Sequence, residues 1–294
     1  MSFLWSSEAA LLLATASSAL MAIFLRLFNK AEGNSYEILL GNYLVCTVIG
    51  FFSLPDISAL RQIDRVTFCC SLVSGFLFVG GLICMQAGIR ENGAILTAAF
   101  ARLGLIVPLV FSILILGERP GLLRFAGLLL VFCAIWVLGK RSKIEKGPAD
   151  GQVNLTILMI VLFVCGAGDS MAKVYEHVGD RAKDELYYFY TFATAFLITG
   201  CLLIYEKYRR HNGNLNFKLL VAGILVGIPN YYASFLLLKA LVGVPAFIVY
   251  PTFSTGAILL VSLISVMFLK EKLSRKNMVG LVLIMAGLLF LNIK

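Results

Sequence analysis

Charged residues are scarce in this chain. Only 14% of the 294 residues are Asp, Glu, Lys or Arg, whereas about a quarter of the residues in a soluble domain are charged. Hydrophobic residues make up 60% of the chain, and the mean hydropathy is +0.92. This apolar excess is too large for one globular core, so it excludes a soluble enzyme, a secreted disulfide scaffold and a disordered protein. It indicates a membrane protein.

Motifs for catalysis and metal binding are also missing. The sequence contains no Walker motif and no HExxH pattern, so nothing points to ATP hydrolysis or membrane proteolysis. The 7 cysteines lie in or beside apolar runs, without CxxC spacing or a neighbouring histidine. That pattern predicts neither a metal site nor a disulfide framework. We expect no catalytic residue, no metal and no cofactor, and we predict that the protein is not an enzyme.

Long apolar runs fill most of the chain. A helix needs roughly 20 apolar residues to cross a bilayer, and we place about ten such runs. They lack the alternation of apolar and polar residues that marks a spanning β-barrel. We therefore predict an all-α polytopic membrane protein with ten transmembrane helices. The predicted spans are 7–28, 35–53, 66–87, 93–116, 121–139, 154–177, 185–205, 217–238, 244–269 and 275–293.

The two halves of the chain resemble each other. Residues 86–138 align with 239–291 without a gap, so that Glu118 meets Glu271, and the earlier spans align less well at a shift of 150 positions. Five spans is an odd number, so the second half enters the membrane in the opposite orientation. Such inverted repeats are typical of secondary transporters, which bind substrate near the midplane between the halves.

The predicted organisation is a first five-helix repeat over 1–140, a basic connecting loop over 141–153 and a second five-helix repeat over 154–294. We expect the two repeats to surround a central cavity. Because both repeats lie in one chain, a monomer is sufficient to close this cavity, and a homodimer is equally compatible with it.

Two matching segments carry a family resemblance. Residues 113–120 read ILILGERP and precede a Gly-rich run from Gly127, and residues 266–273 read VMFLKEKL and precede a similar run from Gly280. Two five-helix halves with these segments resemble the EamA branch of the drug/metabolite transporter superfamily. The resemblance implies ten helices in a basket around a central cavity, and transport of amino acids, other metabolites or drugs, often outward. The second half departs from the pattern because Lys270 stands where glycine is expected.

The orientation of the termini has two conflicting indications. Lys and Arg residues are more numerous in the loops opposite both termini, which favours external termini by the positive-inside rule. Members of the resembling family are drawn with both termini in the cytoplasm. We expect an integral protein of the bacterial inner membrane and leave both orientations open.

Three charged residues inside predicted spans are the first candidates for a substrate site, because charge within the bilayer is costly and is typically functional. Arg102 lies near the middle of the fourth span. Its guanidinium would bind a substrate carboxylate or phosphate through two parallel hydrogen bonds, or it would serve as a structural partner for a carboxylate or for helix carbonyls. Asp169 would bind a substrate cation or take up a coupled proton.

Lys173 lies one helical turn after Asp169. It would face a substrate phosphate together with Arg102. Alternatively Asp169 and Lys173 neutralise each other, because Asp before Lys at this spacing is the favourable order for a pair within a helix. Glu118 matches the family motif at a turn near the membrane surface, where we expect a structural ion pair or a helix cap.

A second candidate group combines an amide with tyrosines beside prolines inside the eighth and ninth spans: Asn230, Tyr231, Tyr232 and Tyr250. Proline removes a helix hydrogen bond, and tyrosine supplies an apolar face with a hydroxyl. The alternative for each tyrosine is helix packing or a place at the membrane interface. Pro108 in the fourth span is a candidate kink.

These candidates predict a secondary transporter that exports a small metabolite by alternating access. A cation, an anion and tyrosines in one cavity would suit an amino acid or a similar zwitterion. Alternatives are an exporter of drugs or other apolar compounds, a nucleotide or sugar-phosphate exchanger and, from other classes, a membrane-embedded transferase or a scaffold. Expected partners are the substrate, membrane lipids and a coupled proton, with no nucleic acid despite the net charge of +9.

Overall fold

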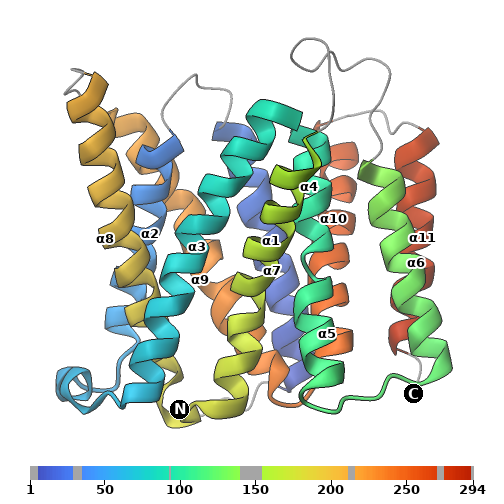
Figure 1. Cartoon of the computed structure of the whole chain (residues 1–294), viewed down its shortest axis with the longest axis horizontal. Helices are drawn as coiled ribbons and strands as arrows, with labels where there is room; N and C mark the ends of the chain where they lie inside the picture. Colours follow the sequence, from blue (N-terminus) through green and yellow to red (C-terminus); the bar gives the residue numbers. More distant parts are fainter. Residues whose placement is uncertain are drawn as a thin grey trace.

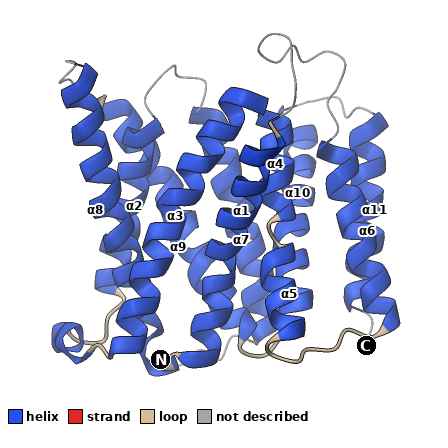
Figure 2. Ribbon diagram, viewed as in Figure 1, coloured by secondary structure: helices blue, strands red, loops and turns tan. Residues whose placement is uncertain are grey.

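The computed structural model describes residues 6–28, 35–92, 94–139, 154–210, 216–269 and 275–292, and within these ranges all regular structure is helical (Figure 2). The α-helices are α1 (Ser7–Phe28), α2 (Ser35–Phe52), α3 (Arg65–Asn92), α4 (Ala94–Leu103), α5 (Ile106–Leu114), α6 (Leu122–Gly139), α7 (Leu155–Val178), α8 (Asp184–Arg210), α9 (Phe217–Leu241), α10 (Ala246–Leu269) and α11 (Arg275–Asn292). Short 3₁₀ helices cover Ile57–Gln62 and Arg181–Lys183.

Many of these helices are long and apolar enough to cross a membrane. Within the described residues 6 segments meet both conditions: Ser7–Leu25, Arg65–Asn92, Leu155–Val178, Arg181–Arg209, Phe217–Leu241 and Ala246–Ile264. Shorter apolar helices are Tyr36–Phe52, Phe100–Leu114, Leu122–Val137 and Met278–Leu291. Large apolar side chains such as Leu12, Phe76 and Leu197 are exposed along the helices. Such a surface suits hydrocarbon rather than water, and identifies an integral membrane protein.

The two halves of the chain run in opposite directions through the bundle (Figure 1). Both ends of the chain lie at the lower edge of the view, which we call the termini side; the upper edge is the opposite side. α1 ascends from the termini side, whereas α7, the first helix of the second half, descends from the opposite side. This is the arrangement that an odd number of spans in each half predicts.

Helix contacts follow the same internal symmetry. α2 packs on α9 and α3 packs on α8; α1 packs on α10, while α4 and α5 pack on α7. α2 also packs on α8, and α6 on α11. When α1–α3 are equated with α7–α9, α4 and α5 with α10, and α6 with α11, each contact has a counterpart in the other half. The halves are therefore interleaved around a shared centre rather than set side by side.

The predicted fourth span is broken between α4 and α5. Pro108 has no N–H to donate to the carbonyl of Gly104, one turn earlier. The N–H of Val107 donates to that carbonyl instead, over 2.9 Å, in a tighter turn. The break also brings Gly104 against Gly166 of α7, so closely that a Cβ on Gly166 would overlap the Gly104 carbonyl oxygen. The predicted kink at Pro108 is thus confirmed as a full interruption of the helix.

Packing is uneven along α10. Most side chains from 246 to 257 are buried, whereas those from 258 to 263 are half-buried or exposed. α10 begins at the termini side, so its packed part lies there. Buried Val249 belongs to a core cluster with Leu11 of α1 and Leu241 of α9, and buried Phe247 belongs to another with Leu109 and Leu128. These clusters seal the bundle toward the termini side.

Candidate functional site

Asp169 of α7 lies deep among the helices, yet its side chain is exposed. Many protein atoms surround the carboxylate, and the side chain nevertheless keeps a large accessible surface. The hydroxyl of buried Tyr250 donates a hydrogen bond of 2.9 Å to the backbone carbonyl of Asp169 and ties α10 to α7 at this level. A side chain that is surrounded by protein and still accessible faces an internal opening. Asp169 is therefore the candidate carboxylate for contact with a ligand inside the bundle.

Arg102 faces the same region from α4. It is half-buried in the last turn of the helix, two residues before Gly104, whose backbone contacts α7 at Gly166. Arg102 and Asp169 are close enough to interact electrostatically. In the part of the chain that the structure describes, the two groups nevertheless form no ion pair with each other. Two opposite charges that lie near each other without an ion pair are candidates for binding a ligand that carries both charges.

Lys173 is held by carboxylates other than Asp169. Its Nζ lies 3.2 Å from Glu118 Oε1 and 3.1 Å from Glu176 Oε2, and its side chain is only 9% exposed. The alternative in which Asp169 and Lys173 neutralise each other is therefore wrong, because the lysine ammonium pairs with Glu118 and Glu176 instead. Glu176 also forms an ion pair with Arg181, whose Nη2 lies 2.6 Å from Glu176 Oε1.

Glu118 makes both of the contacts expected from its motif. Besides Lys173, its Oε1 accepts the backbone N–H of Ala246 over 3.2 Å, at the first residue of α10. It thus forms an ion pair and caps a helix. The preceding Gly117 has a φ of 71°, a left-handed conformation that glycine adopts at little cost. This turn directs Glu118 back into the bundle from the connection between α5 and α6.

Asn230 and Tyr231 lie at a different interface, where α9 packs on α2. Asn230 Nδ2 donates to Asn42 Oδ1 over 3.2 Å. Tyr231 is fully buried, and its ring lies 5.8 Å from that of Phe192 between centroids. No contact among the described residues joins this pair to Arg102 or Asp169. The structure thus brings together Arg102, Asp169 and Tyr250 but leaves Asn230 and Tyr231 in the packed scaffold.

Tyr232 belongs to an outward-facing stripe on α9. It is exposed, as are Val221, Leu225 and Ile228, which recur at the spacing of one helix face. A tyrosine on this face contacts the bilayer. The placement favours the membrane alternative for Tyr232 over substrate contact.

Two residues at the site were not among the sequence candidates. Glu176 lies one turn after Lys173 on the same helix face, and this spacing was visible in the sequence. Cys165 lies one turn before Asp169, is half-buried, and is within electrostatic range of both Arg102 and Asp169. Its i, i+4 relation to Asp169 was the available signal. Both residues extend the polar face of α7 through the centre of the protein.

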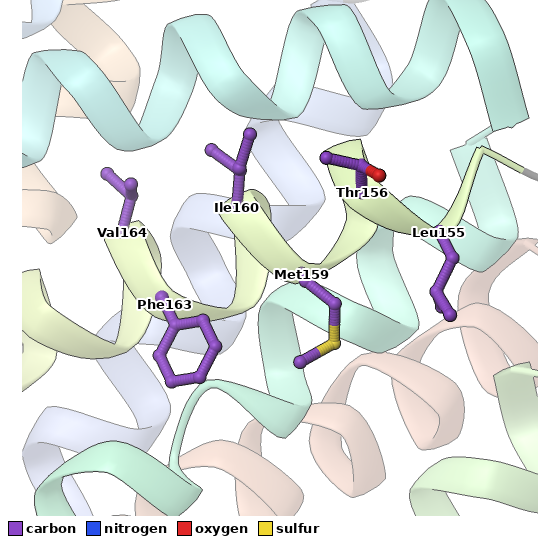
Figure 3. Close-up of a pocket in the computed structure, with 6 residues that line it drawn as sticks. All are labelled: Leu155, Thr156, Met159, Ile160, Phe163 and Val164. Atoms are coloured by element: carbon purple, nitrogen blue, oxygen red, sulfur yellow. The ribbon is translucent and has the colours of Figure 1, made fainter.

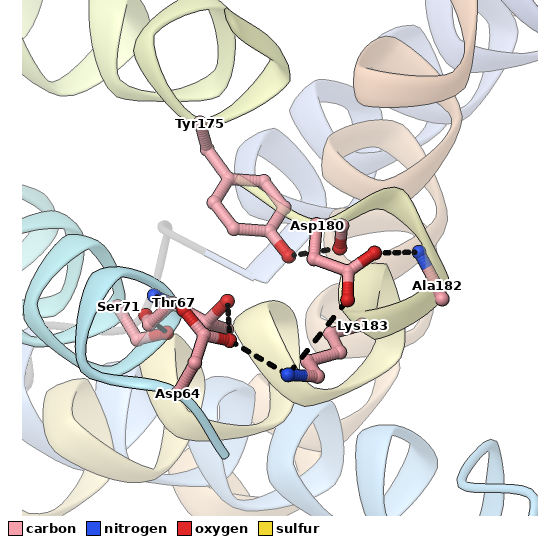
Figure 4. Close-up of polar contacts among 7 residues, drawn as sticks. All are labelled: Asp64, Thr67, Ser71, Tyr175, Asp180, Ala182 and Lys183. Carbon is pink, nitrogen blue, oxygen red and sulfur yellow. Dashed lines mark hydrogen bonds and ion pairs between the residues drawn. The ribbon is translucent and has the colours of Figure 1, made fainter. Parts of the chain in front are cut away.

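A second polar cluster ties the repeats together at the termini side (Figure 4). Asp64 precedes α3 and accepts the backbone N–H of Thr67 at 3.0 Å and its hydroxyl at 2.7 Å, while Lys183 donates to it at 3.0 Å. These hydrogen bonds, above all the one from the Thr67 backbone, hold the pKa of Asp64 well below its usual range. In the same cluster Tyr175 donates to the backbone carbonyl of Asp180 over 2.9 Å. The connection between α7 and α8 is thereby anchored to the start of α3.

An apolar groove of about 490 Å³ runs along the first half of α7 (Figure 3). Its lining residues are Leu155, Thr156, Met159, Ile160, Phe163 and Val164. Most of these side chains are exposed and none is charged, so the groove opens toward the bilayer. It is separate from the charged site at Asp169. Within the described residues no group of three or more His, Cys, Asp or Glu side chains could hold a metal ion.

The fold and the buried charges define a polytopic membrane protein built from two inverted repeats around a polar centre. The model of the EamA-like transporter family matches residues 5–140 and again residues 155–293. The chain therefore belongs to the EamA-like transporter family, within the drug/metabolite transporter superfamily, and the resemblance seen in the sequence is confirmed.

Relatives of the chain extend over one or both repeats. It is 22% identical over 285 residues to an uncharacterized protein of Haemophilus influenzae, across 92% of this chain and 93% of the relative. It is 32% identical over 147 residues to an uncharacterized protein of Methanocaldococcus jannaschii, across 49% of this chain but 98% of the relative. That relative has the length of a single repeat. A protein of known crystal structure, 15% identical, shares the fold with a TM-score of 0.71 over 98% of this chain and 97% of the other.

Proposed function

We propose that the protein is a secondary transporter with ten transmembrane helices that exports a small zwitterionic metabolite, of the amino-acid type, by alternating access. The observation that carries this proposal is the accessible carboxylate of Asp169 facing the unpaired guanidinium of Arg102 inside an inverted repeat. Their opposite charges match the ammonium and carboxylate of a zwitterion. Membership of a transporter family supports transport as the task of the site.

Each residue has a distinct task in this mechanism. Arg102 holds the substrate carboxylate through its planar fork of N–H donors, and Asp169 holds the ammonium. Tyr250 keeps α10 at the level of Asp169 through its hydrogen bond to the Asp169 carbonyl. The interleaved halves rock about this site so that it opens to one side at a time.

Asp169 also supports coupling to protons. A proton and a substrate ammonium compete for the same carboxylate, so binding of one releases the other. Exchange of substrate against protons drives export wherever the proton gradient points inward.

The structure bears on the alternative of a nucleotide or sugar-phosphate exchanger. That alternative needs two cations facing the phosphate, and Lys173 is engaged by Glu118 and Glu176. The single remaining cation, opposite an acidic residue, favours a carboxylate with a neighbouring ammonium over a phosphate.

The test is flux in liposomes that contain the purified full-length protein. Radiolabelled amino acids are loaded in mixtures and then singly, with and without a proton gradient. We expect release that the gradient accelerates, and a loss of at least about tenfold in both Arg102→Gln and Asp169→Asn, because each removes one charge of the site. Arg61→Gln is the matched control, since Arg61 is exposed outside the membrane segments. Unchanged flux in both site variants, in folded protein, would overturn the assignment.

A further inference from the structure

Accessibility changes abruptly within one turn of α7. Asp169 is exposed and Lys173 is buried, although four residues separate them on the same helix face. Lys173 is the closer of the two to the termini side, because α7 descends toward it (Figure 1). The part of α10 that packs beside this level, around Tyr250, is buried, whereas its far half is more open. Side-chain accessibility around Asp169 thus ends at Lys173, and α10 is packed more closely on the termini side of this level than on the opposite side.

At the level of Lys173, a single carboxylate oxygen of the first repeat contacts two groups of the second repeat. Glu118 belongs to the first repeat, and its Oε1 accepts from Lys173 Nζ and from the N–H of Ala246, both at 3.2 Å and both in the second repeat. Ala246 begins α10, where the free N–H groups carry the positive end of the helix dipole. The other oxygen, Oε2, is buried and has no hydrogen-bond partner among the described residues. The carboxylate thus depends on these two donors, and opening the protein at this level requires it to leave both.

The closing lysine is present in one repeat only. In the alignment of the two halves, Glu118 corresponds to Glu271, but Lys173 corresponds to Ile23. The next cation along that helix, Arg26, stands about one turn farther from the centre. Alternating access in an inverted repeat exchanges the conformations of the two halves. The two end states therefore differ in whether a lysine one turn from the site bridges the repeats.

We propose that Glu118, Lys173 and the N-terminus of α10 form a latch that holds the cavity shut on the termini side. Because the other repeat lacks the lysine, the latched state is the resting state, and Asp169 faces the side opposite the termini until the latch opens. The latch rests on the proposed transport function, but its test reads accessibility and not flux.

Cys165 provides a native reporter for this test. It lies one turn from Asp169 toward the side opposite the termini and within electrostatic range of Asp169 and Arg102. The experiment uses the full chain in its membrane with the remaining cysteines replaced by alanine: Cys46, Cys69, Cys70, Cys84, Cys133 and Cys201. A membrane-impermeant maleimide is applied to intact cells or to inverted vesicles, and a tag at the C-terminus shows which preparation exposes the termini side.

We expect Cys165 to react from the side opposite the termini and to be protected from the termini side. Glu118→Gln and Lys173→Met should each raise the rate of labelling from the termini side about tenfold, which corresponds to ~1.4 kcal/mol between the two states. The double variant should exceed neither single variant by much, because both remove the same contact. Asp169→Cys, in a chain in which Cys165 is also replaced by alanine, serves as a second reporter at an exposed position.

The matched control is Glu37→Gln. Glu37 also pairs with a lysine and accepts a backbone N–H, but on the opposite side of the protein. Protection that persists in both latch variants would overturn the proposal, and so would free labelling of the wild type from the termini side. An equal effect of Glu37→Gln would do the same, since it would indicate general loosening. If the labelling pattern holds while no substrate moves in liposomes, the latch stands and the proposed transport function falls.

Discussion

Two glutamates join the repeats by the same kinds of contact at opposite ends of the protein. At the termini side Glu118 Oε1 binds Lys173 Nζ at 3.2 Å and the N–H of Ala246 at 3.2 Å. At the opposite side Glu37 Oε1 binds Lys207 Nζ at 2.9 Å and the N–H of Asn216, just before α9, at 3.0 Å. Each carboxylate of the first repeat thus holds a lysine and a helix start of the second.

Their surroundings differ. Glu37 stands at the start of α2, where α2 and α9 touch through glycines: a Cβ on Gly41 would overlap the carbonyl of Leu220, and a Cβ on Gly223 would overlap that of Ile38. Glu118 stands on a connection after the broken fourth span, and its partner Lys173 lies one turn from accessible Asp169. An ion pair inside a rigid glycine contact reinforces a scaffold, whereas the same ion pair beside an opening controls access. Local packing, more than the ion pair itself, therefore decides whether each glutamate stabilises the scaffold or controls access.

The largest expected effect comes from forcing the rigid interface apart. Gly223→Val places a side chain against the α2 backbone at Ile38, where no side-chain rotation relieves the overlap. We expect a loss of about 3 kcal/mol or more in stability and little folded protein, measured by size-exclusion chromatography and thermal unfolding in detergent. The matched control is Gly200→Ala in α8, where the nearest atom to an added Cβ is Leu40 Cδ1 at an ordinary 3.7 Å. Normal yield of Gly223→Val would show that the interface is not rigid.

The stability losses of Glu37→Gln and Glu118→Gln compare the two glutamate contacts directly. Glu37 is 5% exposed and Glu118 is 16% exposed, and after Glu118→Gln the ammonium of Lys173 keeps its ion pair with Glu176 at 3.1 Å, so we expect the change at the more enclosed Glu37 to cost more stability. Breaking a buried pair costs about 3–5 kcal/mol, and we expect Glu37→Gln to approach that range and Glu118→Gln to fall below it. Thermal unfolding of both variants in the same detergent measures the difference. Equal losses would remove the distinction between scaffold and latch.

A backbone change at Gly117 should weaken the latch more gently. Gly117 has a positive φ, and nothing lies within 4 Å of an added Cβ, so Gly117→Ala introduces backbone strain of about 1 kcal/mol without a clash. This strain displaces Glu118 relative to Lys173. Labelling of Cys165 from the termini side should rise, by less than in Glu118→Gln. If Cys165 is labelled from the termini side no faster in Gly117→Ala than in the wild type, the turn at Gly117 does not position the carboxylate of Glu118.

The smallest effect is expected at the exposed tie between Asp64 and Lys183. The pKa of Asp64 is depressed in the folded protein by its hydrogen bonds to Thr67 and by Lys183. Its stabilising contribution is therefore fully present above the ordinary carboxyl pKa of 3.8 and is lost as the pH falls toward the depressed value. Asp64→Asn keeps a side chain that caps α3 but removes the charge. The melting temperature of the variant should lie slightly below that of the wild type at pH 7, and the gap should close as the pH falls below 4. A gap that widens in acid would contradict this.

The course of the helices was predictable because each depends on a local property. Apolar runs bounded by short polar connections located the helices within a few residues, and Pro108 indicated the break between α4 and α5. The family segments around Glu118 and Glu271 were also local, and they sufficed to recognise the EamA-like family.

The partners of the intramembrane charges were less predictable, because they depend on helices distant in sequence. Lys173 has an acid one turn before it and another nearly one turn after it, and spacing alone favoured Asp169, whereas the fold supplies Glu118 from 55 residues earlier. The prolines and polar residues of α9 did not reveal that Asn230 hydrogen-bonds to Asn42 of α2 or that the ring of Tyr231 packs near Phe192 of α8. Tyr232 was predicted at the substrate site with the membrane interface as the alternative, and its exposure together with Val221, Leu225 and Ile228 favours that alternative.

The inverted repeat affects the balance between the two end states of the proposed transport cycle. If both halves were identical, the inward-open and outward-open states of the proposed carrier would have equal free energies, and the empty carrier would populate them equally. Joining the halves in one polypeptide frees each copy to change separately. A single lysine at position 173, opposite isoleucine at position 23, is enough to lift that degeneracy. In the proposed alternating-access cycle, the empty carrier would therefore populate one side of the membrane more than the other.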